Sequence, residues 1–177
     1  MPELKVDNIS LRGKIDRIDF NRDENLYKVV DYKLSNNKIP GKEITDGISL
    51  QLPVYLFAAG EILKTKFPKV KPDPGVAGLY SFKRANFGFK GLKYSRSPVS
   101  KLISSEKDPL IEYNREIINN GLKFIREYVS SISQGKFNLS TLQERDKVAC
   151  AFCKFDKICR KPDSVSETEP AGENADE

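Results

Sequence analysis

Histidine and tryptophan are absent from this sequence of 177 residues, and cysteine occurs only three times. Without histidine, the chain can form neither a Ser-His-Asp triad nor a Cys-His pair, and no imidazole is available to ligate zinc. Any chemistry within this chain must therefore depend on carboxylates, lysines, tyrosines or a bound metal.

Long hydrophobic runs are also missing. No apolar stretch approaches the length that crosses a bilayer, and no basic segment followed by an apolar one opens the chain as a signal peptide would. We therefore expect a cytoplasmic protein. With 38% hydrophobic and 31% charged residues, the composition is typical of one soluble α/β domain, and the length is too short for two.

The net charge of +5 is unevenly distributed. Residues 164–177 contain five carboxylates and no basic side chain, so the rest of the chain has a net charge of about +10. A basic surface of this kind suits a polyanion such as nucleic acid, although charge alone does not identify the partner. We expect residues 163–177 to form a disordered acidic tail.

The first part of the chain has the pattern of a β-hairpin. Residues 9–20 and 26–34 are rich in Ile, Val and Tyr, and the polar residues 21–25 separate them as a turn. Because Val29 and Val30 are adjacent, the second strand is apolar on both faces. We expect it at the centre of a covered sheet.

Apolar residues at helical spacing predict two helices. The first runs from a cap at Asp46 or Ser49 to about Lys64, with Pro53 in its first turn. The second starts at Asp108 and presents one apolar stripe that we expect in the core. The stripe consists of Leu110, Tyr113, Ile117, Gly121, Phe124, Ile125, Tyr128 and Ile132.

The segment between these helices is less regular. Residues 66–75 contain three prolines and are predicted to be a loop, and residues 75–82 form a short apolar strand. Residues 83–107 are polar, basic and aromatic. They are either a loop on the substrate side or a solvated connection whose aromatic side chains reach the core.

Two aspartates and a lysine in the hairpin are candidates for chemistry. Side chains two residues apart on a strand share a face, so Asp31 and Lys33 project together while Tyr32 points the other way. An adjacent antiparallel strand can bring Asp16 beside them. Two carboxylates so placed call for a cation, and oxygen-rich sites suit Mg²⁺ or Mn²⁺. A lysine beside the metal can hold a water or stabilise charge on a phosphate.

The alternative interpretation is that these aspartates form ordinary ion pairs at strand ends. The apolar approach of residues 27–30 favours a buried strand end for Asp31 and Lys33, and hence a site. Arg17 and Asp19 fall on the face opposite Asp16, so we predict a structural ion pair for them rather than metal ligation.

Three motifs occur in an order that is known from one family. The sequence Gly13-x-x-Asp16, then Asp31-x-Lys33 after an apolar strand, then Gln51-x-x-x-Tyr55 at the start of a helix, resembles the PD-(D/E)XK nucleases of the RecB and AddB type. A cysteine cluster adds to the resemblance. It is similar to the C-terminal cluster with which AddB-type and related CRISPR-associated nucleases hold a [4Fe-4S] centre, and consists here of Cys150, Cys153 and Cys159, followed by Arg160.

The resemblance implies a fold and an activity. The fold is an α/β restriction-endonuclease-like core with a small mixed sheet flanked by helices, over a nuclease domain of residues 1–162 that includes the cysteine cluster at 145–161. The activity is metal-dependent exonucleolytic hydrolysis of DNA that leaves a 5′-phosphate. The implied context is double-strand break repair and recombination, with a helicase subunit, or a helicase domain of the same longer polypeptide, as partner.

The resemblance also implies roles for individual residues. Lys33 would orient or activate the attacking water. Gln51 and Tyr55, one helical turn apart, would brace the site or contact DNA, although Tyr55 can equally be a core aromatic. The implied ligands of Mg²⁺ or Mn²⁺ are the carboxylates of Asp16 and Asp31 and the main-chain carbonyl of Tyr32.

The chain departs from the family in two respects. Family members usually carry a helix before the first strand, with an acidic or histidine side chain for the metal site, and a first cysteine far upstream. Neither is present here, so we expect a fragment truncated at the N-terminal side of the domain. The three cysteines could then hold [4Fe-4S] in the full-length protein, bind another metal, or remain reduced thiols.

Two functions of other classes remain as alternatives. One is a non-catalytic DNA-binding module that retains the nuclease fold, against which the joint presence of Asp16, Asp31 and Lys33 argues. The other is a small zinc or iron-sulfur module, against which the lack of a fourth cysteine or any histidine argues.

Overall fold

The computed structural model describes residues 4–34, 41–83, 88–91, 104–136, 150–151 and 153–155. The chain divides into two compact units, Met1–Gln134 and Gly135–Glu177. The first contains two sheets and three helices. In the described part of the chain, no helix combines the length and apolar character needed to span a membrane.

A four-stranded sheet is the base of the first unit. Its strands are β3 (Arg17–Asn21), β4 (Leu26–Lys33), β5 (Asp73–Ser81) and β6 (Gly88–Gly91), side by side in this order. The central pair, β4 and β5, is parallel, and the other two pairs are antiparallel. This confirms the small mixed sheet and the central position of the second hairpin strand.

The predicted hairpin is right from β3 onward and wrong before it. Residues 9–20 do not form one strand, because β2 (Ile9–Leu11) pairs with β1 (Leu4–Val6) in a separate two-stranded sheet. Residues 12–16 connect the two sheets without strand structure. Two basic residues and a glycine at positions 12–14 interrupt the apolar alternation there, which disfavours a continuous strand.

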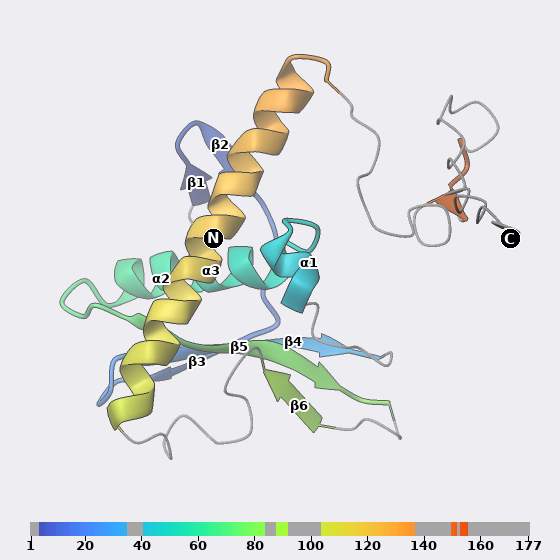
Figure 1. Cartoon of the computed structure of the whole chain (residues 1–177). Helices are drawn as coiled ribbons and strands as arrows, with labels where there is room; N and C mark the ends of the chain where they lie inside the picture. Colours follow the sequence, from blue (N-terminus) through green and yellow to red (C-terminus); the bar gives the residue numbers. More distant parts are fainter. Residues whose placement is uncertain are drawn as a thin grey trace, which may run out of the picture. The chain divides into compact units, whose positions relative to one another are not determined.

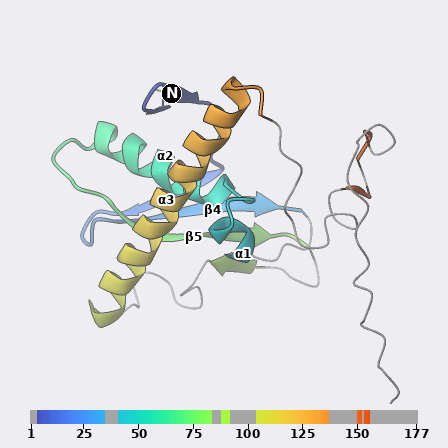
Figure 2. The ribbon, with the colours of Figure 1, turned by 45° about the horizontal axis from the view of Figure 1, so that its top comes forward.

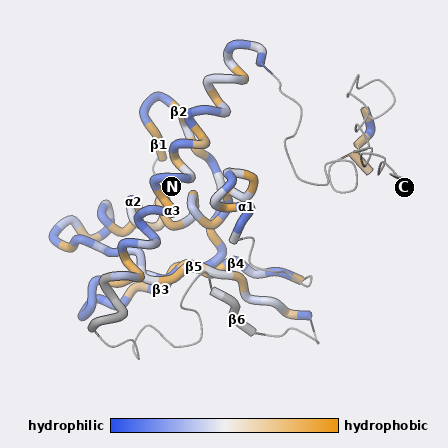
Figure 3. The backbone as a smooth tube through the Cα atoms, viewed as in Figure 1, coloured by the Kyte–Doolittle hydropathy of each residue, from blue (hydrophilic) through white to orange (hydrophobic). Residues whose placement is uncertain are grey.

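The helices α1 (Gly41–Thr45), α2 (Gln51–Lys66) and α3 (Ser104–Ser133) lie on one side of the four-stranded sheet (Figure 1), and α3 crosses α2 in both ribbon views (Figures 1 and 2). Hydrophobic stretches mark β5, and hydrophobic and hydrophilic stretches alternate along α3 (Figure 3). The core between helices and sheet is formed by Tyr27, Val29, Ile44, Leu52, Leu56, Ala59, Leu63, Ala77, Leu79 and Ile117.

The start of α2 differs from the prediction. Leu50 occupies the cap position and makes no side-chain hydrogen bond, so neither Asp46 nor Ser49 caps the helix. Both residues instead follow the unpredicted helix α1, because their backbone N–H groups donate to carbonyls within it. Pro53 lies in the first turn of α2, as predicted, where its missing N–H costs no helical hydrogen bond.

The long helix also starts earlier than predicted and is less buried at its end. α3 begins at Ser104 rather than Asp108, with Pro109 inside it. Leu110, Ile117 and Ile125 are buried, as the stripe predicts. Tyr128 and Ile132, however, are 42% and 58% exposed, which contradicts their assignment to the core. The end of α3 extends past the sheet (Figure 1), so its last turns have less to pack against.

Residues 83–107 contain β6 and the first turn of α3, neither of which was predicted. The strand before them, β5, begins two residues earlier than expected. Residues 84–87 and 92–103 lie outside the described residues, and so do residues 163–177, predicted as the acidic tail. Both interpretations of the basic segment therefore remain open, and the domain bounds 1–162 and 145–161 remain predictions.

Tyr27 ties β4 to α2. Its buried hydroxyl donates a hydrogen bond of 2.9 Å to the carbonyl of Leu56, and a Cβ on Gly60 would lie 3.0 Å from that hydroxyl oxygen. Burial raises the pKa of Tyr27 above its ordinary value of 10.0. Neutral Tyr27 therefore contributes stability that is fully present below pH 10 and is lost as the pH rises from there towards the folded-state pKa.

We expect Tyr27→Phe to lower the free energy of unfolding at neutral pH by about 1 kcal/mol, the usual net worth of a buried hydrogen bond. The variant should also lose less stability than the wild type above about pH 10. Urea denaturation at neutral and alkaline pH measures both effects. Tyr128→Phe, which removes a half-exposed hydroxyl bonded to the carbonyl of Gly47, is the control, and an identical alkaline profile for both variants contradicts the prediction.

Candidate functional site

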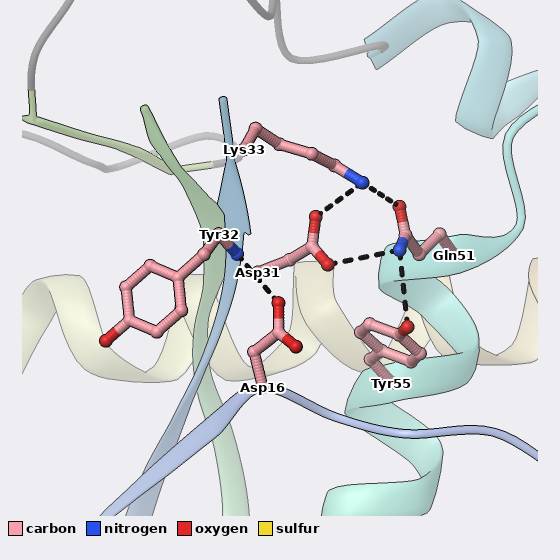
Figure 4. A network of polar contacts seen from close by, with 6 residues as sticks. All are labelled: Asp16, Asp31, Tyr32, Lys33, Gln51 and Tyr55. Carbon is pink, nitrogen blue, oxygen red and sulfur yellow. Dashed lines mark hydrogen bonds and ion pairs between the residues drawn. The ribbon is translucent and has the colours of Figure 1, made fainter. Parts of the chain in front are cut away.

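Asp31 and Lys33 stand at the end of β4 and face α2 (Figure 4). Asp31 is only 4% exposed, and the Nζ of Lys33 lies 2.8 Å from its Oδ2. Tyr32, between them, points to the opposite face and is 37% exposed. The predicted alternation along this strand is confirmed.

Gln51 and Tyr55 reach the same place from the start of α2. The Nε2 of Gln51 donates to Asp31 Oδ1 at 3.1 Å and to the Tyr55 hydroxyl at 3.2 Å. Its Oε1 accepts from Lys33 Nζ at 3.2 Å. Tyr55 also packs against the core cluster. Its ring is thus partly a core aromatic, while its hydroxyl belongs to the polar network.

Asp16 joins this network from the other neighbouring strand. It directly precedes β3, whose pairing with β4 stops at Arg17 opposite Val30. The main chain of Tyr32 therefore faces Asp16 instead of a strand, and its N–H donates to Asp16 Oδ2 at 3.0 Å. The predicted position of Asp16 beside the end of β4 is confirmed.

The carbonyl of Tyr32 points to the same side as its N–H. The carbonyl of the next residue, Lys33, accepts a 2.9 Å hydrogen bond from the N–H of Phe82 just beyond β5. Successive residues of a strand direct their main-chain groups alternately to the two neighbouring strands. The Tyr32 carbonyl is therefore directed away from β5 and towards Asp16.

One oxygen of Asp31 lacks a hydrogen bond. Oδ2 is buried, and although the ammonium of Lys33 lies close enough for an ion pair, no donor among the described residues meets it with hydrogen-bond geometry. A buried carboxylate oxygen in this situation is unfavourable unless a cation or a strong donor satisfies it. The end of β4 therefore offers a buried anionic oxygen suited to binding a cation.

The donor set around this oxygen fits a hard divalent cation. Asp31, Asp16 and the carbonyl of Tyr32 supply oxygens only, which Mg²⁺ and Mn²⁺ prefer. Among the residues that the structure describes, no group of three or more acidic, histidine or cysteine side chains could hold a metal. Water or a phosphate oxygen of a substrate would have to complete the coordination, as is usual for Mg²⁺.

Arg17 and Asp19 lie on the other face of the sheet. The Nε of Arg17 donates to Asp19 Oδ1 at 2.7 Å, which confirms the predicted ion pair. This hydrogen bond raises the pKa of Arg17. Neither residue is part of the network around Asp31.

The cysteine cluster belongs to the second unit, and only part of it is described. The N–H of Cys153 donates to the carbonyl of Cys150 at 3.0 Å, so these two residues lie in one tight turn. Cys150 is half-buried and Cys153 is exposed. Cys159 lies outside the described residues, and the [4Fe-4S] assignment stays a prediction.

Sequence reasoning missed Ser81. This residue pairs in register with Lys33 across the parallel strands and is 2% exposed, and its Oγ accepts the N–H of Lys83 at 3.2 Å. Periodicity identifies β5 as a strand but does not reveal which strand it pairs with. Gly13 of the first motif is different, because nothing lies within 4 Å of where its Cβ would be, so the structure shows no steric need for glycine there.

Comparison with known proteins assigns the family. The profile of the PD-(D/E)XK nuclease superfamily matches residues 2–160. The chain therefore belongs to this superfamily of nucleases, as its three motifs indicate.

Particular relatives are larger proteins, each a subunit of an ATP-dependent helicase/deoxyribonuclease. Over 205 residues the chain is 23% identical to the one from Bacillus thuringiensis (strain Al Hakam), a match that covers 89% of this chain and 17% of the relative. The Bacillus anthracis protein of the same name matches equally. The Lachnoclostridium phytofermentans protein of that name is 40% identical over 76 residues, 42% of this chain and 6% of the relative. The chain thus spans a small part of these relatives, and no solved structure matches it significantly.

Proposed function

We propose that this chain is a metal-dependent DNA exonuclease domain of a helicase-nuclease subunit that acts in double-strand break repair and recombination. Membership of the nuclease superfamily supports the class of reaction, and the deoxyribonuclease named among the relatives supports DNA as the substrate. The observation that carries the proposal is Asp31, a buried carboxylate with one oxygen free of hydrogen bonds, set between Lys33 and Asp16. A cytoplasmic location and a helicase partner are parts of the same proposal.

Asp31, Asp16 and the carbonyl of Tyr32 would hold Mg²⁺ or Mn²⁺. When bound, such an ion polarises the scissile phosphodiester and stabilises negative charge on the leaving oxygen. The burial of Asp31 matters here because electrostatic interactions are stronger where water is excluded. Asp16 is fixed for this purpose by the N–H of Tyr32, which leaves its second oxygen for the cation.

Lys33 would act on the attacking water and on the phosphate. An ammonium has three N–H donors, and the described contacts of Lys33 direct one to Asp31 and one to Gln51. The third can donate to a water or to a non-bridging phosphate oxygen. A fixed positive charge there stabilises the charge that develops on the phosphate in the transition state.

Gln51 would keep Asp31 and Lys33 in place. Its amide oxygen faces the ammonium and its amide nitrogen faces the carboxylate. The Tyr55 hydroxyl accepts the second amide proton and so favours this orientation of the amide. Gln51 is therefore a positioning residue in this proposal, and Tyr55 supports it.

The test is degradation of end-labelled single-stranded DNA with Mg²⁺, with Mn²⁺ and with EDTA. We expect cleavage that requires the metal and that Lys33→Ala reduces about a hundredfold or more. Lys64→Ala, which removes a lysine paired with Glu61 on the surface of α2, should cleave like the wild type. Metal-independent cleavage, or equal activity of the two variants, overturns the assignment. DNA binding without any cleavage would favour the non-catalytic module.

Removing the amide bridge should have a smaller effect than removing Lys33. We expect Gln51→Ala to lower the cleavage rate about 10- to 100-fold, the range typical of residues that orient groups at a metal site. Gln134→Ala, which removes a glutamine bonded to Ser130 at the end of α3, is the matched control. A Gln51→Ala variant with the wild-type rate would show that the bridge has no functional role.

A further inference from the structure

The four-stranded sheet has a second face, opposite the helices, and no described helix covers it (Figure 1). Side chains that alternate with those of the core share this face on β3, β4 and the end of β5. They line a shallow groove of about 320 Å³. The lining residues are Arg17, Asp19, Lys28, Val30, Tyr32, Tyr80 and Phe82.

Three aromatic rings gather in this groove. The ring centroids of Tyr32 and Tyr80 are 5.8 Å apart, those of Tyr32 and Phe82 are 5.5 Å apart, and those of Tyr80 and Phe82 are 5.3 Å apart. Phe82 is 48% exposed and Tyr32 is 37% exposed. Exposed aromatic side chains on adjacent central strands of an open sheet are a common platform on which proteins stack the bases of a single-stranded nucleic acid.

The charges around the rings favour a polyanion. Arg17 reaches the aromatic cluster, since one of its Nη atoms donates to the Tyr32 hydroxyl at 3.4 Å. Lys28 lies on the neighbouring strand of the same groove. Asp19 offsets one of these two positive charges, so the groove keeps a net positive charge within a chain of net charge +5.

We propose that this face binds a single strand of DNA by stacking bases on Tyr32, Tyr80 and Phe82. Phosphates of the strand would pass near Lys28 and Arg17. Tyr32 belongs to both faces, because its N–H holds Asp16 while its ring lines the groove. A bound strand would therefore sit directly behind the proposed cleavage site. The choice of DNA rests on the proposed function, whereas stacking on the rings does not require cleavage.

The absence of tryptophan from the chain permits a direct test. Phe82→Trp introduces a single indole into the groove, and Tyr128→Trp introduces one at a similarly exposed position on α3. Titration with an oligothymidylate in EDTA, where no metal-dependent cleavage occurs, should quench the fluorescence of Phe82→Trp in a saturable manner. It should leave that of Tyr128→Trp unchanged. Equal quenching of both, or none of the first, overturns the inference.

A second measurement separates stacking from bulk. Fluorescence anisotropy of a labelled oligothymidylate should show that Phe82→Leu binds about tenfold more weakly than the wild type, while Phe82→Trp binds at least as tightly. Equal affinities for all three proteins would mean that something other than a DNA strand, such as a polypeptide segment, occupies this face, and would overturn the inference.

The two proposals fail in distinguishable ways. If oligothymidylate quenches Phe82→Trp but the wild type shows no metal-dependent cleavage, the stacking surface stands and the exonuclease assignment falls. If cleavage is metal-dependent while quenching and affinity are unaffected by the changes at Phe82, the exonuclease assignment stands and the stacking surface falls.

Discussion

Replacing Asp31 with asparagine is expected to lower metal-dependent DNA cleavage about a thousandfold or more and to abolish Mn²⁺ binding in calorimetry. The asparagine has the shape of the aspartate but neither its charge nor its second acceptor oxygen. The Lys33 ammonium would then face a neutral amide instead of the carboxylate that it now contacts at 2.8 Å. The variant thus loses the cation ligand and the partner that fixes Lys33.

Asp73→Asn is the matched control for this experiment. Asp73 begins β5 and pairs with Arg115 on α3 at 2.5 Å, so its removal deletes an ion pair of the same chemical kind away from the proposed site. We expect this variant to bind Mn²⁺ and to cleave DNA like the wild type. Circular dichroism should show both variants to be folded. Retention of Mn²⁺ binding by Asp31→Asn would mean that the cation site lies elsewhere.

Replacing Gly47 with alanine is expected to lower the free energy of unfolding by about 3 kcal/mol, mostly through overpacking. Gly47 has a φ of 74°, and this left-handed conformation costs a residue with a Cβ about 1 kcal/mol. The new Cβ would also lie within 2.6 Å of three ring atoms of Phe124. That ring stacks on Tyr128, whose hydroxyl bonds to the carbonyl of Gly47, so it has little freedom to move. Overpacking of this kind costs about 1–3 kcal/mol more.

Gly135→Ala isolates the backbone contribution. Gly135 has a similar φ of 67°, but nothing lies within 4 Å of where its Cβ would be. Urea denaturation should therefore show a loss of about 1 kcal/mol or less for this variant. Equal losses for the two glycine variants would mean that the contact with Phe124 relaxes at no cost.

The geometry of the candidate site was largely predictable because it depends on local periodicity. Alternation along a strand places Asp31 and Lys33 on one face, and a separation of four residues on a helix places Gln51 and Tyr55 together. The hairpin brings Asp16 to the end of β4. The Tyr32 N–H that holds Asp16 was not predictable, since it depends on the residue at which the pairing of β3 with β4 stops.

The rest of the fold depends on contacts between distant parts of the chain, which periodicity does not encode. The parallel pairing of β4 with β5, which brings Ser81 beside Lys33, is set by the shared core and not by either strand alone. The short helix α1 and the strand β6 are too brief to show a period. The apolar stripe of α3 continues in the sequence to Ile132, beyond the sheet that could bury it.

The contact between α2 and α3 has a consequence for how the protein is made. A Cβ on Gly121 would lie 2.5 Å from the Cβ of Pro53, so the first turn of α2, which carries Gln51, rests directly on α3. Every residue proposed for cleavage lies at or before position 55, whereas the glycine that seats their helix lies at 121. The ribosome therefore releases the whole cleavage machinery well before the helix that holds it in position, and the nascent chain acquires a working site only once α3 has emerged and docked.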